Sequence, residues 1–238
     1  MFFSWEDIKV FLPPLLSGAK VTILLTVLVM ALALAWGLLL ALARLSRFRV
    51  LRILARFYVE VIRGTPLLLQ LFYAYYVLPF VGIKLDPFSA GTIGLTVNYS
   101  AYLSEVYRAG IQAVDKGQIE AGLSLGMSRS LLMRRIILPQ AIRIVLPPIG
   151  NYFISLFKDT SLVSIITLKD LMFTGEVLAA STFKNFEIFT LIALIYLAIC
   201  YPGALGVTWM EQRLRMGQRA RALSARGRRL VAWSRAAR

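Results

Sequence analysis

The chain has 238 residues, of which 58% are hydrophobic and 16% are charged. Soluble domains average about 45–50% apolar and about 25% charged residues, so this composition indicates a membrane protein. The sequence contains no histidine and one cysteine, Cys200, which excludes histidine catalysis, metal sites built from His and Cys, and an intrachain disulfide. The formal net charge of +15 suggests nucleic-acid binding at first, and the distribution of the charges decides against it.

Residues 1–16 open with MFFSWEDIKV, which lacks the basic start of a secretory signal peptide. Its aromatic residues are typical of a segment at a membrane surface. We therefore expect residues 1–16 to be an extracytoplasmic, interfacial segment that stays on the protein.

Five uncharged runs follow, at residues 21–43, 64–83, 87–104, 144–157 and 188–210. A helix needs about 20 residues to cross the bilayer, so the shorter runs must extend beyond their uncharged part. This predicts an all-α membrane protein with five transmembrane helices, at about 18–43, 56–80, 87–110, 139–157 and 188–210. We expect Pro147-Pro148 to kink or break the fourth span.

Basic residues alternate between the segments that connect these spans. The segment after the first span carries five arginines and no acid, and residues 108–143 carry six basic residues against two acids. Residues 212–238 carry nine arginines and no acid, whereas the connections after the second and fourth spans have no such excess. Since basic connections stay in the cytoplasm, we predict the N-terminus outside and the C-terminus in the cytoplasm.

Residues 212–238 form the predicted basic cytoplasmic tail. An arginine-rich arm fits RNA binding, but directly after a span it is more typical of an anchor on anionic lipid headgroups. We therefore interpret the tail as a lipid anchor and expect no nucleic-acid partner.

Residues 118–128, QIEAGLSLGMS, lie in the predicted cytoplasmic segment between the third and fourth spans. Read as a helix, they place apolar residues on one face and small residues, among them Gly122 and Gly126, on another. Small residues let a partner approach closely, which indicates a docking helix. A connector helix that rests on the membrane surface fits the same residues.

The pattern Glu120-Ala121-Gly122, Gly126, Ile136-x-Leu138-Pro139 resembles the EAA loop of ABC importer permeases, EAA-x3-G-x9-I-x-LP, with Gly122 in place of the second alanine. Neighbouring runs resemble the polar amino acid uptake permeases within that group. These runs are LLSGAKVTILLT, RGTPLLLQL from Arg63, SAYLSEVYRAGIQAVDKGQIEA from Ser100, and KDTSLVS from Lys158. The resemblance covers about residues 12–211, and it departs from the family at Ala109, Asp115 and Gly122.

The resemblance implies a type I permease domain, at residues 17–211, that moves a polar amino acid across the bacterial cytoplasmic membrane. The implied partners are a dimer of P-loop ABC ATPases, an extracytoplasmic substrate-binding protein, a second permease copy (identical or a sibling) and membrane lipid. ATP and Mg²⁺ would belong to the ATPase, because this chain has no G-x-x-x-x-G-K-[ST] motif; we expect it to bind no cofactor or metal and to be no enzyme. The implied ATPase-coupling residues are Gln118, Glu120, Ala121, Gly122, Gly126 and Met127.

Ionisable groups at membrane depth are costly and usually face a protein interior. Glu60 with Arg63 and Glu105 with Arg108 form two pairs three residues apart, which either line a path for a zwitterion or neutralise each other near the interface. As substrate-path residues we predict Asn98, Tyr102, Glu105, Asn151 and Ser155.

The segment after the fourth span is the predicted outer mouth of the path. Its candidate gate residues are Lys158, Asp159 and Thr160, followed by a short predicted helix over residues 162–173. An amphipathic helix at the membrane surface fits that stretch equally well.

Other functions compete with the importer hypothesis. A channel or secondary transporter would need an internal inverted repeat, and the sequence shows none. An intramembrane enzyme would need a catalytic constellation within the spans, which is also missing. A non-transporting membrane scaffold subunit stays open, because it would keep the loop and lose only the path.

Overall fold

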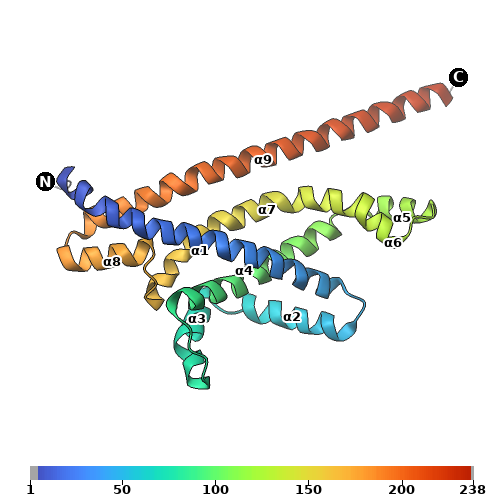
Figure 1. Ribbon diagram of the computed structural model, residues 1–238. Coiled ribbons are helices and arrows are strands. Elements are labelled where there is room, and N and C mark those ends of the chain that lie inside the picture. Colours follow the sequence, from blue (N-terminus) through green and yellow to red (C-terminus); the bar gives the residue numbers. More distant parts are fainter. Residues whose placement is uncertain (1–4, 237–238) are drawn as a thin grey trace.

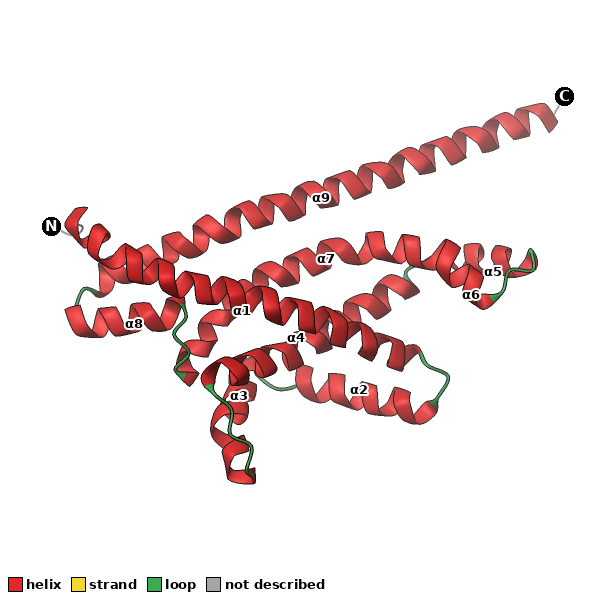
Figure 2. Cartoon of the chain, in the orientation of Figure 1, coloured by secondary structure: helices red, strands yellow, loops and turns green. Residues whose placement is uncertain are grey.

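The structure is a computed structural model that describes residues 5–236, with side chains described for residues 8–214. Its described residues form helices and turns without a strand (Figure 2), which confirms the all-α prediction. The α-helices are α1 (Trp5–Leu45), α2 (Arg49–Arg63), α3 (Leu67–Phe72), α4 (Pro87–Gln112), α5 (Lys116–Ser124), α6 (Arg129–Leu132), α7 (Leu138–Asp159), α8 (Leu171–Thr182) and α9 (Asn185–Ala236).

The long helices lie beside one another (Figure 1), and α4 packs against both α1 and α7. The core forms where these three meet, from residues such as Leu25, Leu95 and Leu156, all with no exposed surface. Gly37 of α1 faces α4, where an added Cβ would lie only 3.0 Å from the carbonyl oxygen of Ser100. Small residues at such contacts let membrane helices approach closely, and here they fix α1 against α4.

Two helices are long and apolar enough to cross a membrane alone, at Ile8–Leu45 and Asn185–Leu214. A bent pair, Arg49–Arg63 with Leu67–Val81, passes the same test with a bend of 104°. α4 and α7 are less apolar, because they carry the polar residues that face one another inside the protein. Sequence hydropathy therefore gives its weakest signal for a membrane span at α4 and α7, the helices that hold the candidate site.

The predicted second span, 56–80, is a broken element whose first helix begins earlier, at Arg49. α2 ends at Arg63, and the chain turns through Gly64–Pro66 into α3, a π-helical turn (Tyr73–Val77) and a 3₁₀ turn (Leu78–Val81). The bend has a local cause, since proline disfavours a helical conformation in the residue before it. The second half projects away from the bundle (Figure 1).

The expected kink or break at Pro147-Pro148 does not interrupt α7, which continues through both prolines. A π-helical turn, Met133–Ile137, joins α6 to α7, which begins at Leu138 with Pro139 as its second residue. Proline lacks the N–H of a regular helical turn, and the wider turn before it accommodates that loss.

The prediction of one continuous helix over residues 162–173 is wrong. Thr160–Ile166 form a 3₁₀ helix, Thr167 turns with φ +62°, and α8 begins only at Leu171. Asp170 caps α8 by accepting a hydrogen bond from the Phe173 N–H at 2.8 Å, and burial raises the pKa of its carboxyl to about 6.

At the two chain ends the helices extend beyond the predicted boundaries. α1 begins at Trp5, inside the segment predicted as interfacial, while Phe2 and Phe3 lie outside the described residues. α9 continues through most of the predicted tail. The side chains of that tail lie outside the described range, so the lipid-anchor interpretation stays a prediction.

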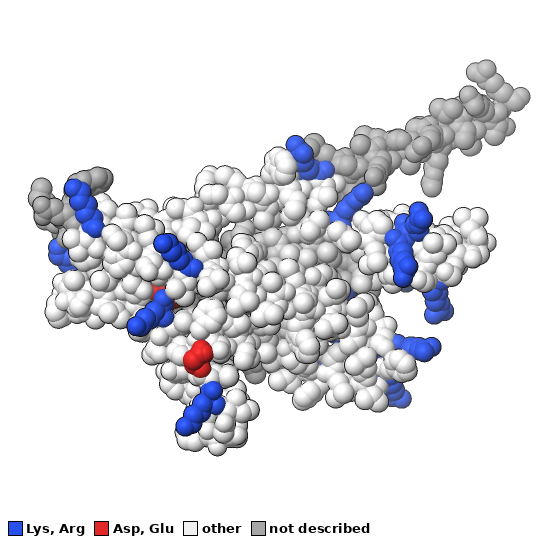
Figure 3. All heavy atoms as spheres, viewed as in Figure 1, with Lys and Arg blue, Asp and Glu red and all other residues white. Residues whose placement is uncertain are grey.

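Charged side chains gather toward the two ends of the elongated molecule. On the face in Figure 3, a broad band without charge separates basic residues over α2 and the α5–α6 region from a smaller group at the opposite end. The turn between α1 and α2, the α5–α6 region and the far end of α9 lie toward the same end (Figure 1). An uncharged band of this kind is what a bilayer requires around a spanning protein.

Candidate functional site

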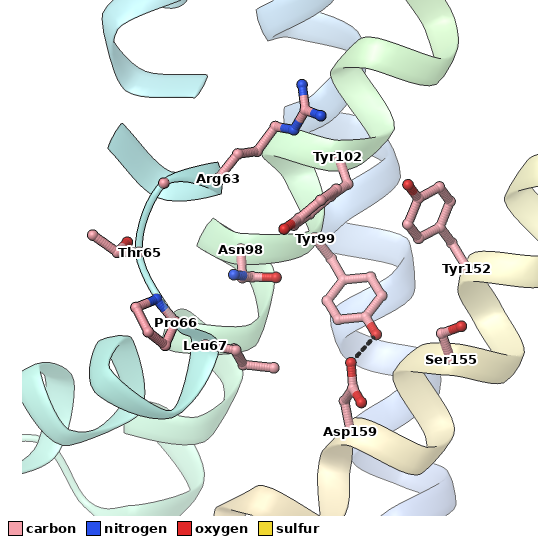
Figure 4. Close-up of a pocket in the computed structure, with 11 residues that line it drawn as sticks. Arg63, Thr65, Pro66, Leu67, Asn98, Tyr99, Tyr102, Tyr152, Ser155 and Asp159 are labelled. Atoms are coloured by element: carbon pink, nitrogen blue, oxygen red, sulfur yellow. Dashed lines mark hydrogen bonds between the residues drawn. The ribbon is translucent and has the colours of Figure 1, made fainter. Parts of the chain in front are cut away.

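A cavity of about 450 Å³ opens between the α2–α3 break, α4 and α7 (Figure 4). We call it the Asp159 cavity; it is lined by residues 63–67, Asn98, Tyr99, Tyr102, Tyr152, Ser155 and Asp159. Its size falls within the range of about 300–1,000 Å³ that is usual for small-molecule sites. Among its lining residues the charged ones are Arg63 and Asp159, one of each sign.

The wall of this cavity at the α2–α3 break is held by Gln70. The Gln70 side-chain amide donates to the carbonyl oxygen of Ile62 and to Oγ1 of Thr65, both at 2.8 Å. Asn98 Nδ2 of α4 in turn donates to Gln70 Oε1 at 3.0 Å. Backbone groups freed by a broken helix need such partners inside a membrane protein. Asn98, predicted as a path residue, therefore lines the cavity and also braces its wall.

Asp159 is fixed by a residue from α4. The Tyr99 hydroxyl donates to Asp159 Oδ2 at 2.6 Å, drawn as the dashed line in Figure 4. The three predicted gate residues occupy different environments: Lys158 is exposed, Asp159 lines the cavity, and Thr160 is buried with its hydroxyl on the Phe157 carbonyl oxygen at 2.7 Å. The structure thus brings Asp159 to the path candidates.

The predicted path residues divide into three groups. Asn98, Tyr102 and Ser155 line the Asp159 cavity. Glu105 lines a neighbouring cavity of about 320 Å³, which we call the Glu105 cavity. Asn151 lies on an exposed face of α7 and lines neither of these two cavities.

Glu105 is held by two arginines, one of which the sequence did not reveal. Arg108 pairs with it from one turn further along α4, as the sequence spacing suggested. Arg44 of α1 donates to Glu105 Oε2 at 2.6 Å. Within the described part of the chain, no salt bridge joins Glu60 and Arg63, the other pair noted in the sequence. Arg63 instead lies over the Tyr102 ring, 5.4 Å from its centroid.

The predicted coupling helix, 118–128, is shorter and starts earlier. α5 runs from Lys116 to Ser124, capped by Asp115, whose Oδ1 accepts from the Gln118 N–H at 3.3 Å. Asp115 was noted in the sequence only as a departure from the family pattern. Because α5 begins at Lys116, Glu120 lies in its second turn. A side-chain oxygen just before a helix satisfies N–H groups that have no partner within it.

Gly126 ends this helix through its backbone conformation. Gly126 has φ +75°, its N–H donates to the Leu123 carbonyl oxygen at 2.9 Å, and the Met127 N–H donates to the Gly122 carbonyl oxygen at 3.1 Å. This is the Schellman arrangement, in which a left-handed residue closes a helix. An added Cβ on Gly126 meets nothing within 4 Å, so the space around it is open.

Gly122 has a packing role within the loop. It is buried, and an added Cβ would lie 2.5 Å from Leu132 Cδ1 of α6. Leu132 belongs to a small core with Val114 and Ile137 that makes α5 and α6 one unit. Gln118, also predicted for coupling, accepts from Gln140 Nε2 of α7 at 2.6 Å. The exposed face of the loop is formed by Glu120, Ala121, Leu123, Leu125 and Gly126.

Residues 33–216 of this chain match the family described as "binding-protein-dependent transport system inner membrane component". The chain belongs to this family. It is a membrane permease subunit of an ABC importer, as its loop motif predicts. Within the described residues, no group of His, Cys, Asp or Glu side chains has an arrangement suited to a metal ion.

Relatives of this permease include two with glutamine in their names. A probable glutamine ABC transporter permease, GlnM of Bacillus subtilis (strain 168), is 42% identical over 199 residues, which cover 84% of this chain and 92% of GlnM. The glutamine transport system permease GlnP of Escherichia coli (strain K12) is 37% identical over 218 residues, covering 91% of this chain and 100% of GlnP. The L-cystine transport system permease TcyB of Bacillus subtilis (strain 168) is 42% identical over 212 residues, covering 88% of this chain and 91% of TcyB.

Solved structures match the fold of this permease over most of its length. A chain in the crystal structure of an amino acid ABC transporter with histidines has a TM-score of 0.85 at 38% identity, covering 90% of this chain and 100% of that one. A chain of the methionine transporter MetNI, in an inward-facing conformation, has a TM-score of 0.67 at 15% identity and shows the shared fold. The type I importer fold is thereby confirmed.

Proposed function

We propose that this permease carries a polar amino acid inward across a bacterial cytoplasmic membrane, with energy from a separate P-loop ATPase dimer. A substrate-binding protein outside the membrane delivers the amino acid, and a second permease copy, identical or a sibling, completes the walls of the path. Amino acids recur in the names of the relatives, which supports this substrate class.

The substrate proposal rests on the two opposite charges that line the Asp159 cavity. Arg63 and Asp159 line it from opposite walls, and the polar Asn98 and Ser155 lie between (Figure 4). A free amino acid has one carboxylate and one ammonium group, and each loses water when it enters a protein. A guanidinium and a carboxylate replace that hydration with partners of the right sign.

The proposed ATPase site is the exposed face of the α5–α6 loop, which carries the EAA-type residues. Leu125 at its tip is 82% exposed, and Leu123 beside it is 48% exposed. Apolar side chains exposed on a loop of a membrane subunit are typical of a docking surface. The loop lies toward the basic end of the molecule, so we place that end in the cytoplasm and the N-terminus outside.

Affinity purification of the tagged chain from its own cells in mild detergent tests the partnership. Wild type is expected to recover a P-loop ATPase, and Leu125→Arg is expected to lose it, because a charge at the tip would enter an apolar contact. Phe183→Arg is the matched control: Phe183 is 87% exposed, on the turn between α8 and α9 at the opposite end of the molecule, and the ATPase should still be recovered.

Uptake of a panel of radiolabelled amino acids tests the substrate class. Cells that lack the chain are expected to lose ATP-dependent uptake of at least one polar amino acid, and the wild-type chain should restore it. Unchanged uptake across the panel, or recovery of the chain without any ATPase, would contradict the proposal and favour a channel or a scaffold subunit.

A further inference from the structure

The Asp159 and Glu105 cavities share one wall. Arg63, Tyr102 and Tyr152 line both of them. The rings of Tyr102 and Tyr152 lie 6.0 Å apart between centroids, and the Arg63 guanidinium lies over Tyr102 (Figure 4). Three side chains from α2, α4 and α7 thus form a septum between two polar spaces. A solute that passes from one cavity to the other must displace this septum.

The Glu105 cavity is the one closer to the α5–α6 loop. Along α4, the lining residues of the Asp159 cavity end at Tyr102, whereas those of the Glu105 cavity continue to Gly110 and to Ala113 just beyond the helix. Along α7, which runs back from the loop, the Glu105 cavity is lined from Ile144 to Tyr152. The two cavities therefore follow one another toward the proposed ATPase site.

Each cavity has the same pair of charges. Arg63 lines both, and each adds a single carboxylate of its own, Asp159 in one and Glu105 in the other. Within the described part of the chain, Arg63 makes no hydrogen bond and no ion pair, so its guanidinium is available to an anion. A carboxylate that arrives in the first cavity can keep the same arginine as its partner in the second.

The two carboxylates differ in how far their charge is already compensated. Asp159 accepts from the uncharged hydroxyl of Tyr99, and no cationic side chain is paired with it among the described residues. Glu105 is paired with the guanidinium groups of both Arg44 and Arg108. An ammonium group is therefore attracted more weakly to Glu105 than to Asp159, since two cations already lie beside it.

We propose that the Glu105 cavity is a second, low-affinity exit station for the same amino acid, behind a gate formed by Tyr102, Tyr152 and Arg63. The substrate carboxylate stays with Arg63, while its ammonium group moves from Asp159 to Glu105 as the two rings separate. Weaker binding at the exit station favours release on the side of the α5–α6 loop. This inference rests on the proposed transport of an amino acid.

Removal of the gate ring tests the septum. The permease is purified with its ATPase and reconstituted into vesicles loaded with a radiolabelled amino acid that the wild type transports. Tyr102→Ala is expected to release the label without ATP at least about five times faster than wild type, whereas Tyr102→Phe keeps the ring and should stay closed. Tyr107→Ala is the control, because Tyr107 lies on the same helix, packs against the core and lines neither cavity.

If Tyr102→Ala does not assemble, Tyr102→Leu replaces it, since leucine fills the helix contact but cannot stack. Release without ATP from an assembled Tyr102 variant at the wild-type rate overturns the gate. An equal leak in Tyr107→Ala overturns it as well, because the leak would then report general loosening of α4.

Arg108→Gln tests whether the two arginines weaken the attraction of Glu105 for an ammonium group. The substitution leaves only Arg44 beside the carboxylate. The exit station should then hold the ammonium group longer, so that KM and the maximal uptake rate fall together, each by about threefold. Arg108→Lys keeps a positive charge and should restore both values to within about twofold of wild type. A fall in the maximal rate at unchanged KM would contradict an exit station and indicate a structural role for the ion pair.

The two proposals fail in different ways. If wild-type vesicles take up no amino acid with ATP, the proposed function fails. If wild-type uptake is present and the Tyr102 and Arg108 variants behave like wild type, the exit station alone is wrong.

Discussion

The α5–α6 loop and the two cavities are positioned by different kinds of interaction. In the loop, Asp115 begins α5 and Gly126 ends it, and both act on residues within a few positions along the chain. In the cavities, the decisive contacts join distant residues: Tyr99 to Asp159, and Arg44 to Glu105. Local signals set the ends of α5, whereas the packing of α1, α4 and α7 creates the two cavities. Variants that change one region and leave the other intact test whether the two regions are independent.

The largest effect is expected at Gly110, where the two regions meet. An added Cβ on Gly110 of α4 would overlap with Cγ1 of Val145 on α7. Overpacking at such a contact costs about 1–3 kcal/mol, and a β-branched valine has little freedom to move away. Gly110→Ala should therefore reduce both thermal stability of the complex and amino acid uptake, the latter more than about tenfold.

Val145→Ala combined with Gly110→Ala is the matched test of this contact. The double variant should recover uptake relative to Gly110→Ala, because the smaller side chain makes room for the added methyl group. If the losses of uptake in the two single variants simply add in the double variant, the effect of Gly110→Ala does not come from its contact with Val145.

The next effect is expected at Gly126, within the loop. A leucine costs about 1–2 kcal/mol in the left-handed conformation that Gly126 adopts, so Gly126→Leu should lower substrate-stimulated ATP hydrolysis by about tenfold. Asparagine tolerates this conformation, and Gly126→Asn should keep most of the activity. Equal losses in both variants would mean that close approach of the ATPase, and not the backbone turn, requires glycine.

A moderate effect is expected at Gln70, which holds the wall of the Asp159 cavity. Gln70→Leu leaves the Asn98 amide without its partner, at about 1–3 kcal/mol for a buried group, and leaves the Ile62 carbonyl oxygen with only the longer hydrogen bond from the Thr65 hydroxyl, at 3.3 Å. Uptake should fall by about fivefold while the ATPase still co-purifies, because the loop is untouched. Loss of ATPase recovery in Gln70→Leu would contradict the separation of the two regions.

The smallest effect is expected at Asp115. Asp115→Ala removes the cap of α5, which is worth about 1 kcal/mol, and should lower ATP hydrolysis two- to threefold. Asp115→Ser supplies a hydroxyl acceptor in the same place and should restore the wild-type rate. A full loss of activity in Asp115→Ala would indicate direct contact of Asp115 with the partner.

The short helix of the loop could be foreseen because its signals are local, whereas its role in ATPase coupling stays a prediction. The open small-residue face expected for Gly122 is not present, since Leu132 of α6 covers it. That contact depends on how α6 folds back, which no spacing within 118–128 encodes. The early end of α5 was missed for a related reason, because a glycine in a helical pattern was read as a contact residue and not as a C-cap.

The two cavities were harder to foresee because they depend on contacts between helices. Polarity within apolar runs singled out Asn98, Tyr102, Glu105 and Ser155, which line the two cavities; their part in a substrate path stays a prediction. Arg44 was counted only as a topology signal, since nothing in a single sequence links it to Glu105, 61 positions away. Gln70 was visible within the RGTPLLLQL run, and its place after a Gly64–Pro66 break was the signal that a partner for freed carbonyl groups was needed.

We propose that ATP energy enters through the α5–α6 loop and that the amino acid passes through the Asp159 cavity. The most direct measurement compares ATP-driven uptake and ATP hydrolysis in vesicles for wild type, Asp159→Asn and Leu125→Arg. Asp159→Asn keeps an acceptor for Tyr99 and removes only the charge, so it should retain the ATPase and its basal hydrolysis but lose uptake. Leu125→Arg should lose both activities, whereas wild-type uptake by Asp159→Asn would show that the amino acid does not depend on the Asp159 carboxylate.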